Sequence, residues 1–262
     1  MKKLYLFIIM ILIGFMLTSC GEKTYESLYD DYQTYVDEQT QNYQSYIDFV
    51  NQLSNTTVKS VVSIEASFLT YGIQNLGSGA VIDEDDDYYY VLTNSHVVIY
   101  NESVANQYSV KNYLNESVTA TYMFSDENYD LALLKIAKTI EVTCFELDTS
   151  EIMLNDSLIV IGYPSGQNHA ITMGYFIEEN RVVVDDQTSL VNRVTFNVIV
   201  SSVPVKSGSS GSAILNEDLK LIGLIFAGRF QSTTSVSTHS YAIPAQKILE
   251  FLISEGYGGL SV

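Results

Sequence analysis

The sequence is poor in basic residues, in cysteine and in histidine. Only 13 Lys and Arg stand against 31 Asp and Glu, which gives a formal net charge of −18 at pH 7. Such a chain repels nucleic-acid phosphates and anionic lipid headgroups, so we expect no nucleic-acid partner. Two cysteines make no disulfide framework, and the fold must be held by its core, for which a hydrophobic content of 47% is sufficient. The 262 residues leave room for a targeting segment and one domain of about 200 residues.

The sequence also lacks an apolar run long enough to span a membrane comfortably. The run from Leu4 to Leu17 follows two lysines and precedes the small residues of LTSC (17–20), an order typical of a secretory signal peptide. LTSC resembles the bacterial lipobox, which implies cleavage before Cys20 and a lipid on its sulfur; an ordinary signal peptide with an incidental cysteine is the less favoured alternative. We therefore expect a lipoprotein leader over residues 1–19 and a lipid anchor at Cys20 that holds the protein on the outer side of the cell membrane.

Residues 22–58 have the spacing of one amphipathic helix. Apolar and tyrosine side chains recur at intervals of three, four and seven residues with acids between them, as on one face of a helix. They are Tyr25, Tyr29, Tyr32, Val36, Tyr43, Ile47, Val50 and Leu53. Such a helix can act as a spacer between membrane and domain, or it can self-associate through its tyrosines. We favour the spacer and assign it, with the lipidated cysteine, to residues 20–57.

From about Val58 the apolar pattern changes to that of short strands. The segments are VVSIEASF, GSGAVI, YYYVLTN, VTATYMF, DLALLKI, LIVIGY, AITMGYFI, VTFNVIV, AILN, LKLIGLIF and HSYAI. Strands at this spacing predict an all-β sandwich or pair of barrels. The acidic run at 83–87 predicts a solvated hairpin tip, since it lacks the glycine and the alternating ligands of a calcium loop. A closing helix is expected from Pro244, with the proline at its first position and Gly256 just past its end.

The stretch KSGSSGSAIL (206–215) lies between two apolar segments, so we do not expect a flexible linker there. A serine that attacks an acyl carbon needs a base within hydrogen-bond reach and an acid behind that base. His96 directly follows the apolar segment YYYVL, whereas His169 and His239 have polar surroundings. Asp130 opens the otherwise apolar DLALLKI, and a carboxylate at the mouth of a buried strand needs a hydrogen-bonding partner. These residues are the candidates for a nucleophilic site.

Motifs around these residues occur in an order that resembles a known family. They are GSGAVI…YVLTNSHVV, YDLALLKI, VIGYPSG, SGSSGSAIL, IGLIFAG and SYAIP, and over Val58 to Leu252 the chain resembles trypsin-like serine proteases of the Deg/HtrA type. The resemblance implies an all-β fold of two six-stranded antiparallel β-barrels with the active site between them. We expect this protease domain to span residues 58–262, with the amphipathic helix before it and a C-terminal helix at its end. The family's usual PDZ domain is not expected, because few residues follow Pro244.

The resemblance assigns a role to each candidate. The triad follows the chain order His96, Asp130, Ser210, because only Gly208-Ser209-Ser210-Gly211 matches the nucleophile motif Gly-x-Ser-Gly. Ser210 would be the nucleophile, His96 the base and Asp130 the group that orients the imidazole. The backbone N–H groups of Gly208 and Ser210 would form the oxyanion hole.

Two serines depart from the family pattern. Ser209 stands where digestive relatives have an aspartate that pairs with a newly cut N-terminus, so we do not expect activation by that cleavage. Ser212 replaces a second glycine common after the nucleophile. With Ser207, these residues raise the question whether the oxyanion loop is always in its active conformation.

By the same resemblance, four residues would line the substrate pocket. Pro204, six residues before the nucleophile, would lie near its base, and Phe226, Ala227 and Gly228 would form its wall and pair with the substrate backbone as an added strand. Because no acidic residue stands at the base, we expect small or medium apolar side chains on the acyl side of the cleaved bond.

The sequence thus favours a membrane-anchored serine endopeptidase outside the cytoplasm. It would act on polypeptides, misfolded or exported proteins in particular, and would need no metal or other cofactor. The alternative is a catalytically silent surface lipoprotein of the same fold that binds peptides or serves in adhesion.

Overall fold

The computed structural model describes residues 25–166, 168–181, 194–230 and 235–258. The predicted leader and Cys20 lie outside them. The chain divides into two compact units, residues 1–51 and 52–262. The expected N-terminal helix is present as α2 (Tyr25–Asn55). Within the described ranges, no helix is both long and apolar enough to cross a membrane.

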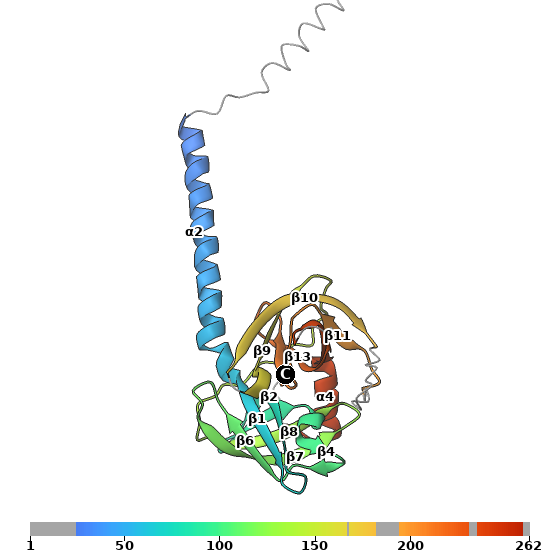
Figure 1. The fold of residues 1–262 in the computed structure, drawn as a ribbon. Coiled ribbons are helices and arrows are strands. Elements are labelled where there is room, and N and C mark those ends of the chain that lie inside the picture. The colour runs from blue at the N-terminus through green and yellow to red at the C-terminus, as the bar shows by residue number, and fades with distance from the viewer. Residues whose placement is uncertain (1–24, 167, 182–193, 231–234, 259–262) are drawn as a thin grey trace, which may run out of the picture. The chain divides into compact units, whose positions relative to one another are not determined.

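The second unit contains two closed antiparallel barrels of six strands each, as expected (Figure 1). The first barrel has the order β1-β2-β3-β8-β7-β6 and the second β10-β11-β14-β13-β12-β9. The strands of the first are β1 (Val61–Phe68), β2 (Ile73–Glu84), β3 (Tyr88–Thr93), β6 (Gln107–Lys111), β7 (Ser117–Asp126) and β8 (Leu131–Ala137). Those of the second are β9 (Ser157–Gly162), β10 (Ala170–Asn180), β11 (Val198–Ser201), β12 (Ala213–Leu215), β13 (Leu221–Phe230) and β14 (Ser237–Pro244).

Short elements connect and close the barrels. They are η1 (Thr57–Ser60), α3 (Ser95–Val98), the two-stranded sheet β4 (Ile99–Tyr100) and β5 (Ser103–Val104), η2 (Pro164–Gly166) and α4 (Ala245–Ser254). Because α4 begins at Ala245, Pro244 is its N-cap and not its first residue as predicted. Proline is tolerated at the N-cap, because a backbone N–H at that position has no partner inside the helix and its loss costs nothing there. Gly256 ends the helix with φ +74°, a conformation that glycine adopts without a steric cost.

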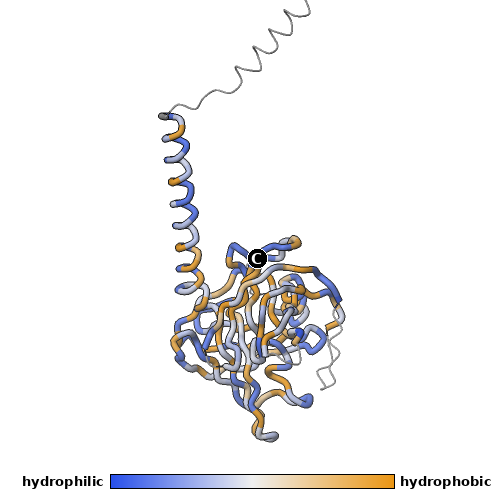
Figure 2. Tube along the Cα trace, turned by 45° about the horizontal axis from the view of Figure 1, so that its top comes forward, coloured by the Kyte–Doolittle hydropathy of each residue, from blue (hydrophilic) through white to orange (hydrophobic). Residues whose placement is uncertain are grey.

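Each barrel encloses its own apolar core, which explains the alternating sequence pattern. In β1 the residues that face inward include Val62, Ile64 and Ala66, all 0% exposed, whereas Leu158, Ile199 and Ile214 belong to the core of the second barrel. Figure 2 shows many apolar residues in the interior of this unit and hydrophilic ones in several of its outer loops. Burial of such side chains is the main favourable term in folding, at about 1.5–3 kcal/mol for each.

Two sequence-based expectations need adjustment. β6 was not among the predicted segments, because QYSVK is short and only Tyr108 and Val110 of it are buried. The predicted segment 194–200 forms a strand only from Val198 on. Of the acidic run at 83–87, Asp83 and Glu84 end β2, and Asp85, Asp86 and Asp87 form the expected exposed tip between β2 and β3.

Strand register brings distant segments to the same place. β3 and β8 are antiparallel, with Thr93 opposite Ala132, so the residues after β3 lie beside those before β8. β9 and β12 are antiparallel, with Ile161 opposite Ala213, so the turn after β9 lies beside the loop before β12. His96 and Asp130 occupy the first of these positions, and the stretch 206–212 occupies the second.

Candidate active site

The side chains of His96 and Asp130 form a hydrogen-bonded pair. The distances from His96 Nδ1 to the two carboxylate oxygens of Asp130 are 2.8 and 3.0 Å. Asp130 is buried, while the His96 side chain is 26% exposed. Nδ1 is thus engaged with the carboxylate, so a proton transfer by this ring would go through Nε2.

Residues that directly follow β3 hold Asp130 in place through hydrogen bonds. Ser95 Oγ donates to Oδ1 at 2.8 Å, and the backbone N–H of His96 donates to the same oxygen at 3.1 Å. The side-chain amide of Asn94 donates to the Asp130 carbonyl at 3.0 Å. Asp130 itself has φ +52°, an uncommon conformation that these contacts maintain. Four donors therefore converge on one residue, and the predicted need of this carboxylate for partners is met.

The stretch around Ser210 is a tight turn that requires two glycines. Gly208 has φ +87° and Gly211 has φ +83°, a region that residues with a Cβ rarely adopt. A Cβ on Gly208 would lie 2.5 Å from Ser165 N, and one on Gly211 would lie 1.9 Å from Ser78 O. Both positions therefore exclude any side chain, for steric as well as conformational reasons.

The peptide that precedes Gly208 has a defined orientation. The N–H of Ser165, in η2, donates to the carbonyl of Ser207 at 3.1 Å. Because a trans peptide directs its carbonyl and its N–H to opposite sides, the N–H of Gly208 is directed away from η2. The turn is further held by bonds from Ser209 N to Lys206 O and from Gly211 N to Ile225 O.

Ser78 of β2 connects the first barrel to this turn. Its backbone N–H donates to the Ser210 carbonyl at 2.7 Å, and its Oγ donates to the Gly208 carbonyl at 3.2 Å. The same Oγ accepts from Tyr163 N at 2.8 Å and from Ser212 Oγ at 3.2 Å. A hydroxyl has one donor and two acceptor positions, so every one of them is used. Sequence reasoning missed this role, although Ser78 stands in the quoted motif GSGAVI.

Ser212 has room for its side chain because the residue that faces it, Gly162, has none. A Cβ on Gly162 would lie 1.7 Å from Ser212 Oγ, so the hydroxyl occupies the space that Gly162 leaves open. Ser212 is 0% exposed and its N–H donates to Ser209 O. The serine in place of a second glycine is thus accommodated without a gap or an unpaired hydroxyl.

Strand β2 lies beside both halves of the candidate site. Asn75 donates to the carbonyls of His96 and Val97, at 3.2 and 3.4 Å, and three residues later Ser78 binds the Ser210 carbonyl. Between them, a Cβ on Gly77 would lie 2.8 Å from Val97 and 3.2 Å from Ser210 O. The turn of His96 and the turn of Ser210 therefore meet at one edge of β2.

The four predicted specificity residues do not share one cavity. Pro204 lines a cavity of about 160 Å³ together with Ser209 and Ser212, and Phe226, Ala227 and Gly228 are not part of its lining. These three belong to β13, where Ala227 and Gly228 pair with β14. Val205 lies between this cavity and β13. It lines the cavity, and a Cβ on Gly228 would lie 2.9 Å from one of its methyl groups.

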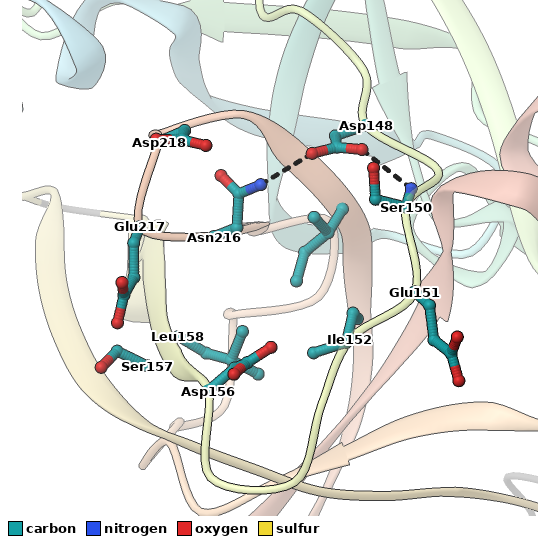
Figure 3. A pocket seen from close by; sticks show the side chains of 11 residues that line it. Asp148, Ser150, Glu151, Ile152, Asp156, Ser157, Leu158, Asn216, Glu217 and Asp218 are labelled. Carbon is teal, nitrogen blue, oxygen red and sulfur yellow. Dashed lines mark hydrogen bonds between the residues drawn. The ribbon is translucent and has the colours of Figure 1, made fainter.

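A second cavity, of about 190 Å³, is lined by carboxylates and lies among other residues (Figure 3). Asp148 there accepts hydrogen bonds from Ser150 and Asn216, and those from Ser150 contribute most to lowering the pKa of its carboxyl. Across the described ranges, no cluster of three or more His, Cys, Asp or Glu side chains is arranged to hold a metal ion. None of the residues lining this cavity belongs to the candidate site.

The other two histidines and Cys144 are not part of the candidate site. His169 contacts the ring of Tyr163, and His239 contacts Thr238 at the surface. Cys144 is exposed as a residue, but burial around its sulfur, with the charges of Glu84 and Asp83, raises the pKa of its thiol to about 12. That thiol stays protonated at neutral pH and is a poor nucleophile.

Comparison with known proteins agrees with this geometry. Residues 77–224, more than half of the chain, match the model of the trypsin-like peptidase domain. The serine protease Do-like HtrB of Bacillus subtilis (strain 168) is 31% identical over 185 residues, which are 68% of this chain and 39% of that protein. An HtrA-like serine protease of Staphylococcus aureus (strain USA300) is 30% identical over 220 residues, 78% of this chain and 28% of that protein. The chain thus spans less than half the length of either relative.

Solved structures show the same fold. The HtrA-type protease AlgW with tripeptide aligns with a TM-score of 0.63 at 25% identity, covering 79% of this chain and 64% of that one. The active form of the Rv3671c protease from M. tuberculosis aligns with a TM-score of 0.61 at 21% identity, covering 78% and 83%.

Replacing Ser78 by alanine is expected to loosen the Ser210 turn. Ser78→Ala leaves the buried Tyr163 N–H without its acceptor, which should lower the free energy of unfolding by about 1–3 kcal/mol. The amides of residues 209–212 should exchange faster with deuterium. Ser60→Ala is the control, because Ser60 is also buried and its hydroxyl also has a partner, Thr143 Oγ at 2.7 Å. It should cost stability without faster exchange in the turn; equal exchange in both variants would contradict the role of Ser78.

Proposed function

Because the chain belongs to the trypsin-like peptidase family, we propose that it is a serine endopeptidase with Ser210 as nucleophile, His96 as base and Asp130 as the residue that orients the base. The observation that carries the proposal is the His96–Asp130 pair at 2.8 Å, beside a turn in which two glycines with positive φ present Ser210. The substrates we propose are polypeptides outside the cytoplasm, misfolded or exported proteins in particular.

Each of the three side chains would have a distinct part in the reaction. Ser210 Oγ would attack the scissile carbonyl while His96 Nε2 takes its proton, and His96 would then return that proton to the leaving amine. The Asp130 carboxylate would hold the imidazole in the tautomer with a proton on Nδ1 and stabilise the imidazolium. The bonds that Asp130 receives from Ser95 Oγ and His96 N support this part, because they hold the carboxylate in one orientation beside the imidazole.

The backbone N–H groups of Gly208 and Ser210 would stabilise the oxyanion. The bond from Ser165 N to the Ser207 carbonyl supports this, because it turns that carbonyl away from the place where the oxyanion would form. A donor of this kind is worth about 3 kcal/mol of activation free energy. No metal or other cofactor is needed for any of these steps.

A fluorophosphonate probe tests this proposal directly. We expect the probe to label the wild-type protein and Ser207→Ala, and to leave Ser210→Ala unlabelled, because Ser210 is the serine that His96 would activate. Ser207 is the matched control, since it is an exposed serine three residues away. If peptide hydrolysis is measured, Ser210→Ala and His96→Ala should each lower turnover by about 10⁶, and the double variant should be no worse.

The absence of labelling in a folded wild-type protein would contradict the peptidase. It would favour the alternative, a catalytically silent peptide-binding or adhesion module of the same fold. Equal labelling of Ser210→Ala and the wild type would show that another serine is the nucleophile.

For specificity, we propose that Val205 limits the space for the substrate side chain. The pocket would lie between Pro204 and the strand segment Phe226–Gly228, which would also pair with the substrate backbone. A Val205 methyl group stands next to Gly228, and Val205 is only 5% exposed. The preferred side chains on the acyl side would therefore be small or medium and apolar.

Truncation of Val205 should widen this preference. With a peptide library, we expect Val205→Ala to cleave after larger apolar residues about tenfold faster than the wild type does. The reason is that one methylene group in an apolar pocket changes the activation free energy by about 1–3 kcal/mol. Val203→Ala is the control, because Val203 is also buried and the substitution shortens a core side chain by the same two methyl groups. An unchanged preference in Val205→Ala, or rapid cleavage after lysine by the wild type, would contradict the assignment.

We further propose that the protein is a lipoprotein anchored through Cys20 on the outer face of the cell membrane. The support is the order of basic, apolar and small residues that ends in LTSC (17–20). Acyl chains contribute about 0.8 kcal/mol for each buried CH₂ group, so two or more hold a protein stably.

Replacement of Cys20 should release the protein from the membrane. In cells supplied with labelled palmitate, we expect the wild type and Cys144→Ser to carry the label and sediment with membranes. Cys20→Ser should carry no label and appear in the soluble fraction. Labelled Cys20→Ser would show that the anchor is elsewhere.

A further inference from the structure

Helix α2 carries a seam of side chains with the seven-residue repeat of a coiled coil. When Tyr29 is assigned position a, positions a and d fall on Tyr29, Tyr32, Val36, Gln39, Tyr43, Tyr46 and Val50. That is three heptads with one polar member. In a straight α-helix a seven-residue repeat drifts about 20° per heptad around the helix axis. Its side chains stay on one contact line only when the helix supercoils around a partner.

The seam faces solvent along α2. Tyr32, Tyr43 and Tyr46 are 61%, 67% and 63% exposed. Tyrosine side chains bury large areas when they dock, and a row of them in water marks an interaction surface.

The composition of α2 gives a lone helix little stability. Its residues, Tyr25–Asn55, include no Lys or Arg, so no acid–base pair can form within it. Tyrosine, aspartate, threonine and asparagine, which recur along it, are weak helix formers. The hydroxyl of Thr40 also bonds back to the Val36 carbonyl at 2.8 Å, a contact that slightly weakens helices. Helices of this kind are stabilised mainly by packing of an apolar face.

The placement of charge favours another copy of the same helix as the partner. Every acidic residue between 29 and 50 lies at position b, c or f, on the outer side of a coiled coil: Asp30, Asp31, Asp37, Glu38 and Asp48. The positions that flank the seam, e and g, are uncharged, with Tyr35, Ile47 and Phe49 among them. Identical helices therefore meet without bringing carboxylates together, whereas anionic lipid headgroups would be repelled and a basic partner would find no acids at the flanks.

From these observations we propose, in place of the simple spacer favoured from sequence, that α2 forms a parallel, in-register coiled coil with α2 of a second copy of this chain. The direction follows from Gln39, the one polar residue of the seam. In a parallel coil a d position faces the same position of its partner, so Gln39 can hydrogen-bond its own copy. In an antiparallel coil it would face a tyrosine or a valine. This inference rests on α2 alone and goes beyond the proposed peptidase activity.

Disulfide cross-linking of the full chain in membranes tests the proposal. In a Cys144→Ser background, Val36→Cys places a thiol at position a and Asp37→Cys places one at b on the next residue. After mild oxidation, we expect about tenfold more cross-linked dimer on a non-reducing gel for Val36→Cys than for Asp37→Cys. The Cα atoms of the two chains approach the roughly 6 Å that a disulfide needs at position a and lie farther apart at position b. Val50→Cys, at a, and Asp48→Cys, at f, form a second, independent comparison.

Equal cross-linking at a and at the outer positions, or none at either a position, would overturn the proposal. An antiparallel coil would also fail this test, because it does not bring Val36 to its own copy. Since the assay reads cross-linking and not hydrolysis, its failure is separate from a failure of the proposed activity.

Discussion

The arrangement of the candidate site depends on one buried hydroxyl, Ser78 Oγ. It donates to the Gly208 carbonyl and accepts from Tyr163 N and Ser212 Oγ, so its full hydrogen-bonding capacity is used between the two barrels. Ser78 also binds the Ser210 carbonyl through its own N–H. A buried polar group of this kind is costly unless every bond is made, and only one placement of the Ser210 turn makes them all.

The close packing around Ser78 restricts which residues can stand beside it. Gly211 has no room for a side chain because its Cα lies against the Ser78 carbonyl, and the space beside Gly162 is filled by Ser212 Oγ. The three serines beside Ser210 raised the question of a mobile loop. In the structure Ser209 and Ser212 are buried, and Ser207 is bound through its carbonyl to Ser165. The serines are thus part of the network that orders the turn.

Much of this site could be predicted from sequence because its signals are local. An apolar strand that ends in a polar turn locates His96, a carboxylate at the start of an apolar strand locates Asp130, and paired glycines locate the turn of Ser210. The role of Ser78 was out of reach, since it arises from contacts with Gly208 and Ser212, more than a hundred residues away. Specificity was also difficult, because the role we propose for Val205 rests on its distance to Gly228, which no spacing in the sequence reveals.

The most direct test of the account is a crystal structure of the protein after reaction with a fluorophosphonate. We predict the phosphorus on Ser210 Oγ, its oxygen within about 3 Å of the N–H groups of Gly208 and Ser210, and the Ser207 carbonyl still bound to Ser165 N. A Ser207 carbonyl turned into the place of that oxygen, or an adduct on any other serine, would contradict the account.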